Sequence, residues 1–247
     1  MSEDFSFKAV DEEGMETLEV VAEAERFNSW MYNTIKPYCS GNILEIGSGI
    51  GNISEYFLNN NLDISLSDLR DNYCEILRKK YKDYPTLKQV IQIDIIDPDF
   101  DAKHKAIFNT FDSIYALNIV EHVKDDKQAI ANCKKLLKPG GKLIILVPAY
   151  QKLYNAFDKE LEHYRRYTQS SLDKLFDANE LSITHRQYYN FVGIFGWWFS
   201  GNVLKKKTIP QGQMKLYNTL VPIIKLIDKI VLQKAGLSVI TVGQKKA

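Results

Sequence analysis

Asn42-Ile-Leu-Glu-Ile-Gly-Ser-Gly-Ile-Gly51 decides the fold of this chain of 247 residues. Its first five residues form a short apolar run typical of a buried strand, and glycines follow at alternate positions. Because glycine has no Cβ, it allows a tight turn and lets a ligand approach the backbone closely. Residues 51–58 then favour a helix, whose first amides would point at that ligand. The segment therefore predicts a strand, a ligand-binding turn and a helix.

Short apolar runs, typical of strands, continue to alternate with helical patterns along the rest of the chain. Further strands are predicted at 63–67, 89–93, 111–117, 142–147, 182–189 and 237–243, with helices at 70–82, 125–138, 170–178 and 216–231. Lys138-Pro-Gly-Gly141 places a glycine where a left-handed helix cap belongs. Strand–helix alternation predicts an α/β fold, with a mostly parallel sheet covered by helices on both faces. Ligands of such sheets bind at the carboxyl edge of the strands.

The glycine spacing separates several nucleotide-binding patterns. A dinucleotide fingerprint requires glycine or alanine three positions after its second glycine, where this chain has Asn52 or Ser54. No Gly-Lys-Ser/Thr follows, so the phosphate loop of ATPases is also missing. Glu45-Ile-Gly-Ser-Gly-Ile-Gly51 instead resembles the E/D-x-G-x-G-x-G pattern of class I S-adenosylmethionine-dependent methyltransferases. Asp68, Asp94, the segment 116–123 and Leu137-Lys-Pro-Gly-Gly-Lys142 follow in the order typical of that family.

The resemblance covers residues 40–150 well and residues 190–236 poorly. It implies a Rossmann-like seven-stranded sheet in the order 3-2-1-4-5-7-6, with S-adenosylmethionine as cofactor and S-adenosylhomocysteine as product. Asp68 would hold the ribose hydroxyls, although an aspartate before a helix also suits an N-cap. Asp94 would bind the adenine amino group. The residues that the resemblance assigns to the cofactor are Glu45, Gly47, Ser48, Gly49, Gly51, Asp68, Leu69, Asp94, Ile95 and Asn118.

Two histidines are candidates for proton transfer, because an unperturbed histidine has a pKa near 6.5. His122 belongs to an acid–His pair that the family often places near the methionine end of the cofactor, and His163 is the second candidate. A purely structural role for His122 is the alternative. The four histidines are scattered and lack metal-ligand spacing, so no metal site is expected.

Asp158-Lys-Glu-Leu-Glu-His-Tyr-Arg-Arg-Tyr-Thr168 is similar to a segment of many uncharacterised bacterial methyltransferases of the small-molecule type. It follows a strand, so it is expected at the active edge. Arg165 and Arg166, with Tyr167, would contact a carboxylate or phosphate of the substrate. Alternatively, the arginines pair with neighbouring acids and order the loop.

Two regions lie outside the alternation. Residues 1–40 are acidic and helical and are expected to form an N-terminal lid over a methyltransferase domain at 41–247, with Trp30 and Tyr32 against the substrate or in the core. Residues 190–236 form an insertion, in which the aromatic stretch 191–199 precedes three lysines. This stretch suits a peripheral membrane contact through 191–207, an apolar acceptor pocket, a dimer face or a cover for the sheet.

Composition limits the remaining possibilities. Residues 1–30 hold nine acids and two bases, unlike a secretory signal. Three dispersed cysteines predict reduced thiols in a cytoplasmic protein, with the inner face of the membrane as a peripheral location. No basic–aromatic array predicts nucleic-acid binding. We expect a monomer or homodimer that methylates a small-molecule or lipid-linked acceptor. The alternatives are a dinucleotide-dependent oxidoreductase and a non-catalytic membrane-associated protein with the same fold.

Overall fold

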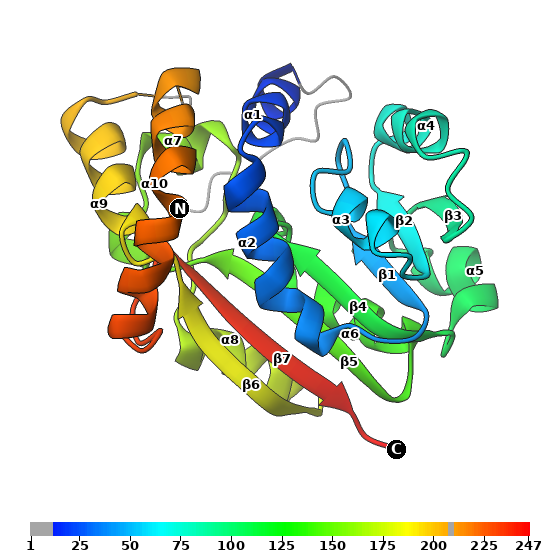
Figure 1. Ribbon diagram of the computed structural model, residues 1–247. Helices are drawn as coiled ribbons and strands as arrows, with labels where there is room; N and C mark the ends of the chain where they lie inside the picture. Colours follow the sequence, from blue (N-terminus) through cyan, green and yellow to red (C-terminus); the bar gives the residue numbers. More distant parts are fainter. Residues whose placement is uncertain (1–11, 207–209) are drawn as a thin grey trace.

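A seven-stranded sheet forms the centre of the computed structural model, which describes residues 12–206 and 210–247 (Figure 1). The strand order is β3-β2-β1-β4-β5-β7-β6, as predicted. Only β7 runs antiparallel to its neighbours β5 and β6. The strands are β1 Ile43–Ile46, β2 Ile64–Asp68, β3 Leu87–Gln92, β4 Phe111–Leu117, β5 Leu137–Pro148, β6 Leu181–Tyr189 and β7 Ser238–Lys245.

Helices cover both faces of the sheet and create two apolar cores. Along β5, Ile144 and Leu146 point to one core, while Leu143, Ile145 and Val147 point to the other. This alternation buries both faces, as a largely parallel sheet requires. The helical elements are α1 Glu12–Ala22, α2 Glu25–Ile35, η1 Lys36–Tyr38, α3 Ser54–Asn59, α4 Asp71–Lys80, α5 Phe100–His104, η2 Lys105–Ile107, η3 Val120–His122, α6 Asp126–Leu136, η4 Gln151–Leu153, α7 Ala156–Glu160, α8 Gln169–Ala178, α9 Gly193–Trp198, η5 Phe199–Val203 and α10 Gln211–Ile230.

The predicted glycine cap at 138–141 is wrong. Helix α6 ends at Leu136, and the next residue is already extended. The carbonyls of Lys135 and Leu136 accept hydrogen bonds from the amides of Asn109 and Thr110, both 3.0 Å long. Because the preceding loop satisfies the last turn, no left-handed cap is needed. Gly140, with φ of +78°, lies inside β5 instead.

The segment between β6 and β7 carries α9, η5 and α10, and α10 packs against α1 and α2 (Figure 1). The sequence predicts one apolar face for this helix, formed by Leu216, Leu220, Ile223, Ile224, Ile227, Ile230 and Val231. Four of these, Leu216, Leu220, Ile223 and Ile230, are exposed. The buried face combines Ile224 with Asp228, whose carboxylate accepts hydrogen bonds from the amides of Asn190 and Phe191 at 2.7 Å each. Asp228 therefore anchors α10 in an orientation that differs from the one predicted by the periodicity of its apolar residues.

Two further findings concern the cysteines and the helices of the described residues. Cys39, Cys74 and Cys133 are free thiols. Within 12–206 and 210–247, no helix combines the length and apolar character needed to cross a membrane.

Candidate active site

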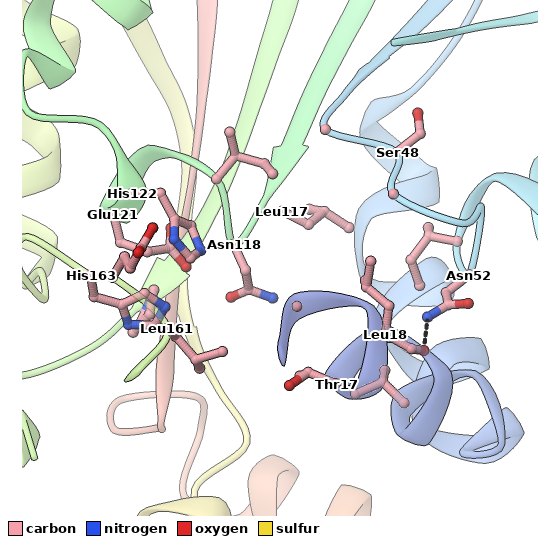
Figure 2. Close-up of a pocket in the computed structure, with 18 of the residues that line it drawn as sticks. Thr17, Leu18, Ser48, Asn52, Leu117, Asn118, Glu121, His122, Leu161 and His163 are labelled. Carbon is pink, nitrogen blue, oxygen red and sulfur yellow. Dashed lines mark hydrogen bonds between the residues drawn. The ribbon is translucent and has the colours of Figure 1, made fainter. Parts of the chain in front are cut away.

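A large pocket with a volume of about 1260 Å³ opens at the carboxyl edge of the sheet. The residues that follow β1, β2, β3 and β4 line it, together with parts of α1, α2, α7, α9 and α10. Figure 2 shows Ser48 and Asn52 on one side of this pocket and Glu121, His122 and His163 on the other. Ligand pockets in proteins usually measure about 300–1,000 Å³. The volume is therefore sufficient for a nucleoside cofactor and a second molecule.

The loop after β1 lines the pocket through Gly47, Ser48 and Gly49. Gly47 has φ of +73°, and a Cβ there would lie 2.1 Å from Cδ1 of Ile119. Gly51 does not line the pocket, which corrects its predicted contact with the cofactor. With φ of +87°, Gly51 packs against Tyr81, whose hydroxyl donates to its carbonyl at 2.9 Å. The third glycine therefore shapes the loop without touching the ligand space.

Two buried carboxylates surround this loop, as predicted, and both line the pocket. Asp68 accepts hydrogen bonds from the amide of Gly49 at 2.9 Å and from the amide of Arg70 at 3.0 Å. Each of its oxygens keeps a lone pair for a further donor. Glu45 accepts from the hydroxyl of Ser54. Burial raises the pKa of Asp68 and raises the pKa of Glu45 to about 7.

The remaining residues predicted to bind the cofactor also reach the pocket. Leu69, Asp94, Ile95 and Asn118 all line it. Asp94 comes two residues after the end of β3, and its Oδ1 accepts from the amide of Ile96 at 2.9 Å. Asn118 is exposed in the pocket with φ of +54°, and its amide donates to Leu146 at 2.8 Å. This left-handed residue turns the chain out of β4 and toward the ligand space (Figure 2).

Helix α1 covers the pocket, with Thr17 and Leu18 facing the strand ends (Figure 2). The carbonyl of Leu18 accepts a hydrogen bond from Asn52 at 2.8 Å, which ties the helix to the glycine loop. Trp30 and Tyr32 do not line the pocket; they are 7% and 5% exposed within the core. Of the two predicted positions, against the substrate or in the core, the structure supports the core, because α2 turns those rings onto the sheet. Part of the predicted lid, residues 1–11, lies outside the described residues.

The segment 158–168 forms a buried ion network. Asp158 is fully buried, and its Oδ1 accepts from Nε of Arg166 at 2.7 Å and lies 2.9 Å from Nδ1 of His163. Burial alone would raise the pKa of Asp158, but His163 and the Arg166 charge lower it overall. Arg166 also donates to the carbonyl of Ala149 at 3.1 Å and lies 4.7 Å from the ring centroid of Trp197. Arg166 lines the pocket, but its charged partner is Asp158 of the same segment.

Arg165 and Tyr167 do not line the pocket, which corrects their predicted role. Arg165 donates to Asp126 at 2.6 Å and to the carbonyl of Lys124 at 2.7 Å. Tyr167 is 3% exposed and donates to the same carboxylate at 2.9 Å. Both residues attach the segment to α6. The alternative interpretation, in which an arginine pairs with a neighbouring acid and orders the loop, is the one that the contacts support for Arg166 with Asp158, whereas Arg165 pairs with the more distant Asp126.

Three side chains meet at the pocket wall opposite the glycine loop. The rings of His122 and His163 lie edge to face, with centroids 4.6 Å apart. Glu121 is fully buried beside them, and neither of its carboxylate oxygens has a hydrogen-bond partner among the described residues. Burial raises the pKa of Glu121 to about 8. His122 is open to the pocket but surrounded by protein, which lowers its pKa, as does His163.

Comparisons with known proteins agree with this geometry. Residues 44–143 match a family model described as a methyltransferase domain. The chain is 30% identical over 123 residues to the ubiquinone/menaquinone biosynthesis C-methyltransferase UbiE of Blochmanniella pennsylvanica, covering 47% of this chain and 46% of that protein. Residues 44–143 therefore resemble a methyltransferase domain, and the strand order is that of the class I methyltransferase fold.

Solved structures extend the likeness beyond the matched residues of the methyltransferase domain. YcgJ of Bacillus subtilis superposes with a TM-score of 0.56 at 16% identity, over 89% of this chain and 98% of that one. Phosphoethanolamine N-methyltransferase 2 of Haemonchus contortus, solved with S-adenosylmethionine, gives 0.58 at 18% identity, over 89% and 52%. At these identities the likeness concerns the fold. The chain spans less than half the length of the curated relative described above.

Several pocket residues of the methyltransferase domain were not predicted. Glu121 stood in the acid–His pair but received no role, and Asp158 was considered only as a partner for the arginines. Tyr217 lines the pocket from the segment that the family pattern does not cover, and Trp197 does so as well, in line with the acceptor-pocket alternative for the stretch 191–199. The contact between His122 and His163 was also not predicted, because the two residues are far apart in the sequence. For Glu121, a signal existed: an acid directly beside a candidate histidine after a strand.

Proposed function

We propose that this protein transfers a methyl group from S-adenosylmethionine to a small-molecule or lipid-linked acceptor. The observation that carries the proposal is the pocket at the carboxyl edge, where Gly47, Asp68, Asp94 and Asn118 converge from the ends of four strands. Asp68 would accept the two ribose hydroxyls, because a carboxylate can take two donors side by side. Asp94 would accept the adenine amino group.

Methyl transfer from a sulfonium is an in-line displacement, and the cofactor supplies the electrophilic carbon. The protein then has to orient the two reactants and exclude water, which together are worth about 7–11 kcal/mol. Helix α1 covers the ligand space, consistent with the proposed lid. Where the acceptor must lose a proton, His122 is better placed than His163, because it is exposed in the pocket while His163 is 4% exposed and bonded to Asp158.

Calorimetric titration with S-adenosylmethionine and S-adenosylhomocysteine tests the cofactor. Saturable binding is expected, weakened at least tenfold in Asp68→Ala and unchanged in Asp63→Ala. Asp63 is a matched control because it pairs with Lys88 at the opposite end of β2, outside the pocket. Binding of NADH alone would instead support the dinucleotide-dependent oxidoreductase. Absence of any binding would contradict the proposal.

The lipid-linked acceptor and peripheral membrane contact rest on α9, η5 and α10. Exposed apolar side chains gather on these elements, and on α10 they recur at helical spacing, so they share one face. These side chains are Phe195, Trp198, Phe199, Val203, Leu204, Leu216, Leu220, Ile223, Leu226 and Ile230. The same segment also carries Lys205, Lys215, Lys225 and Lys229, of which Lys225 and Lys229 fall on another face of α10 by helical spacing, while Lys207 falls outside the described residues. An anionic membrane suits this combination of apolar and basic groups.

The same elements also line the pocket, through Trp197, Met214 and Tyr217. A lipid-linked acceptor could therefore pass from the membrane to the methyl donor along α9 and α10. This placement separates the two tryptophans: Trp197 belongs to the pocket, and Trp198 is 49% exposed.

Pelleting with phosphatidylglycerol and phosphatidylcholine vesicles tests the membrane contact. The protein is expected to pellet with the anionic vesicles, and Trp198→Ser/Ile223→Ser and Lys229→Glu are expected to reduce pelleting. Lys79→Glu, an exposed lysine on α4, is the charge control and should behave like the parent chain. Equal and negligible pelleting of all variants would refute the contact. A dimer that the double variant dissociates would identify the surface as a dimer face.

A further inference from the structure

Glu121, His122 and His163 offer three ligand atoms that all lie within 4.8 Å of one another. Two come from η3 after β4, and the third comes from the loop after α7. The three side chains lie together beside the pocket in Figure 2. Nitrogen and oxygen ligands about 2.1 Å from one ion stand about 3–3.5 Å apart, so small side-chain rotations would close the site.

The strongest support for a ligand site comes from the carboxylate of Glu121. Glu121 is fully buried, and both of its oxygens are without a hydrogen-bond partner among residues 12–206 and 210–247. A buried polar group without a partner is costly, and each such group in a native protein needs an explanation. Arg166 acts on this carboxylate electrostatically, but its Nε is bonded to Asp158. A bound cation would supply the partner that the protein does not.

The second histidine already has the arrangement of a metal ligand. Nδ1 of His163 lies 2.9 Å from Oδ1 of Asp158, which fixes the ring and leaves Nε2 for an ion. Metal-binding histidines usually donate their other N–H to a carboxylate or a backbone carbonyl. Asp158 is itself held by the Asn155 amide at 3.0 Å and by Arg166, so this support is rigid.

We propose that Glu121, His122 and His163 bind a divalent transition-metal ion, such as Zn²⁺, Fe²⁺ or Mn²⁺. Two histidines and one carboxylate suit these ions and leave further coordination positions open. The three residues line the pocket, so the open positions face the ligand space. A hydroxyl or carboxylate oxygen of the acceptor would bind there, an assignment that rests on the proposed function. In this arrangement the ion, instead of His122, would acidify an acceptor hydroxyl.

Co²⁺ is a suitable probe because its visible absorption reports coordination by nitrogen and oxygen. The full chain is stripped with a chelator and titrated with CoCl₂, and then with ZnCl₂ in competition. One equivalent is expected to bind and to develop ligand-field bands, which Zn²⁺ abolishes. Glu121→Gln and His163→Gln are expected to weaken binding at least tenfold. His185→Gln, a half-buried histidine bonded to Gln187 on β6, is the matched control and should bind like the parent chain.

Circular dichroism and S-adenosylmethionine titration of the same variants separate the two proposals. Glu121→Gln keeps the size and the polar end of the side chain, so the variant should fold. Cofactor binding without metal binding would overturn the metal site and leave the proposed function standing. Metal binding without cofactor binding would do the reverse. Equal Co²⁺ binding by the parent chain, Glu121→Gln and His163→Gln would also overturn the assignment.

Discussion

Asp158→Asn is a substitution for which the structure predicts a large loss of stability. The carboxylate is fully buried and neutralises Arg166, whose side chain is 1% exposed. It also holds the ring of His163 and, through Oδ2, the amide of Asn155 at the start of α7. Asparagine keeps the size and some hydrogen bonding but removes the charge. The guanidinium would then remain buried without a counter-ion.

The magnitude follows from the burial of both partners. Breaking a buried ion pair by removing one charge costs about 3–5 kcal/mol, because the other charge stays desolvated. We therefore expect Asp158→Asn to lower the free energy of unfolding by about 3–5 kcal/mol at pH 7. An exposed pair contributes only about 0–1 kcal/mol. Arg186 and Asp173 form a partly exposed pair, with side-chain exposures of 56% and 15%, so Asp173→Asn is expected to cost less and is the control.

Urea denaturation of both variants, followed by circular dichroism, measures the difference directly. The midpoint should fall much further for Asp158→Asn than for Asp173→Asn, with similar slopes. The variant Asp158→Asn/Arg166→Gln removes both charges and should recover part of the loss. Equal destabilisation by the two single substitutions would refute the argument. So would a double variant whose loss equals the sum of the separate losses of Asp158→Asn and Arg166→Gln, since coupled residues are not additive.

Three further predictions concern two glycines, Glu45 and Asp228. Gly47→Ala and Gly140→Ala each place a side chain at positive φ, at a cost of about 1–2 kcal/mol of stability. Only Gly47→Ala, whose Cβ would push on Ile119 in the pocket, should weaken S-adenosylmethionine binding measured by calorimetry, and equal affinities of the two variants would contradict this. Glu45 has a folded pKa of about 7, above its unfolded value near 4.5, so the folded chain holds the extra proton between these values. Its contribution to stability should fall by at most about 1.4 kcal/mol per pH unit as pH rises through that window. Chemical denaturation from pH 5 to 8 should show this slope in the parent chain and lose it in Glu45→Gln; parallel curves would exclude it. Asp228→Ala leaves two backbone amides unpaired and should lower the free energy of unfolding by about 2–6 kcal/mol, from about 1–3 kcal/mol for each amide. Thermal unfolding is the assay, and an unchanged midpoint would contradict the prediction.

The alternation of strands and helices could be predicted from local sequence, whereas the strand order and the residues on the cofactor side of the pocket were implied by the resemblance to a methyltransferase family. Each strand–turn–helix unit of such a sheet is specified by neighbouring residues, and all carboxyl ends of its parallel strands fall at one edge. The resemblance assigned Glu45, Asp68, Asp94 and Asn118 to the cofactor, and all four line the pocket at this edge. The exception is Gly51, which follows the family spacing but serves the contact with Tyr81.

The acceptor side could not be predicted in the same way. Trp30 and Tyr32 share an aromatic cluster in the sequence, yet both are buried on the sheet, because helical phase decides which ring faces inward. The phase of α10 was also misjudged, since buried Asp228 caps distant backbone amides. Periodicity counts apolar residues and does not register a buried carboxylate.

The sequence by itself determined the order of elements, the glycine loop and the acids after β2 and β3, because these depend on residues close together in the chain. Only the tertiary structure decided that Glu121, His122 and His163 meet, and that Arg165 faces α6 while Arg166 faces the pocket. The physical reason is that these contacts join loops after different strands. Their distances follow from sheet register and helix packing, which no local pattern encodes.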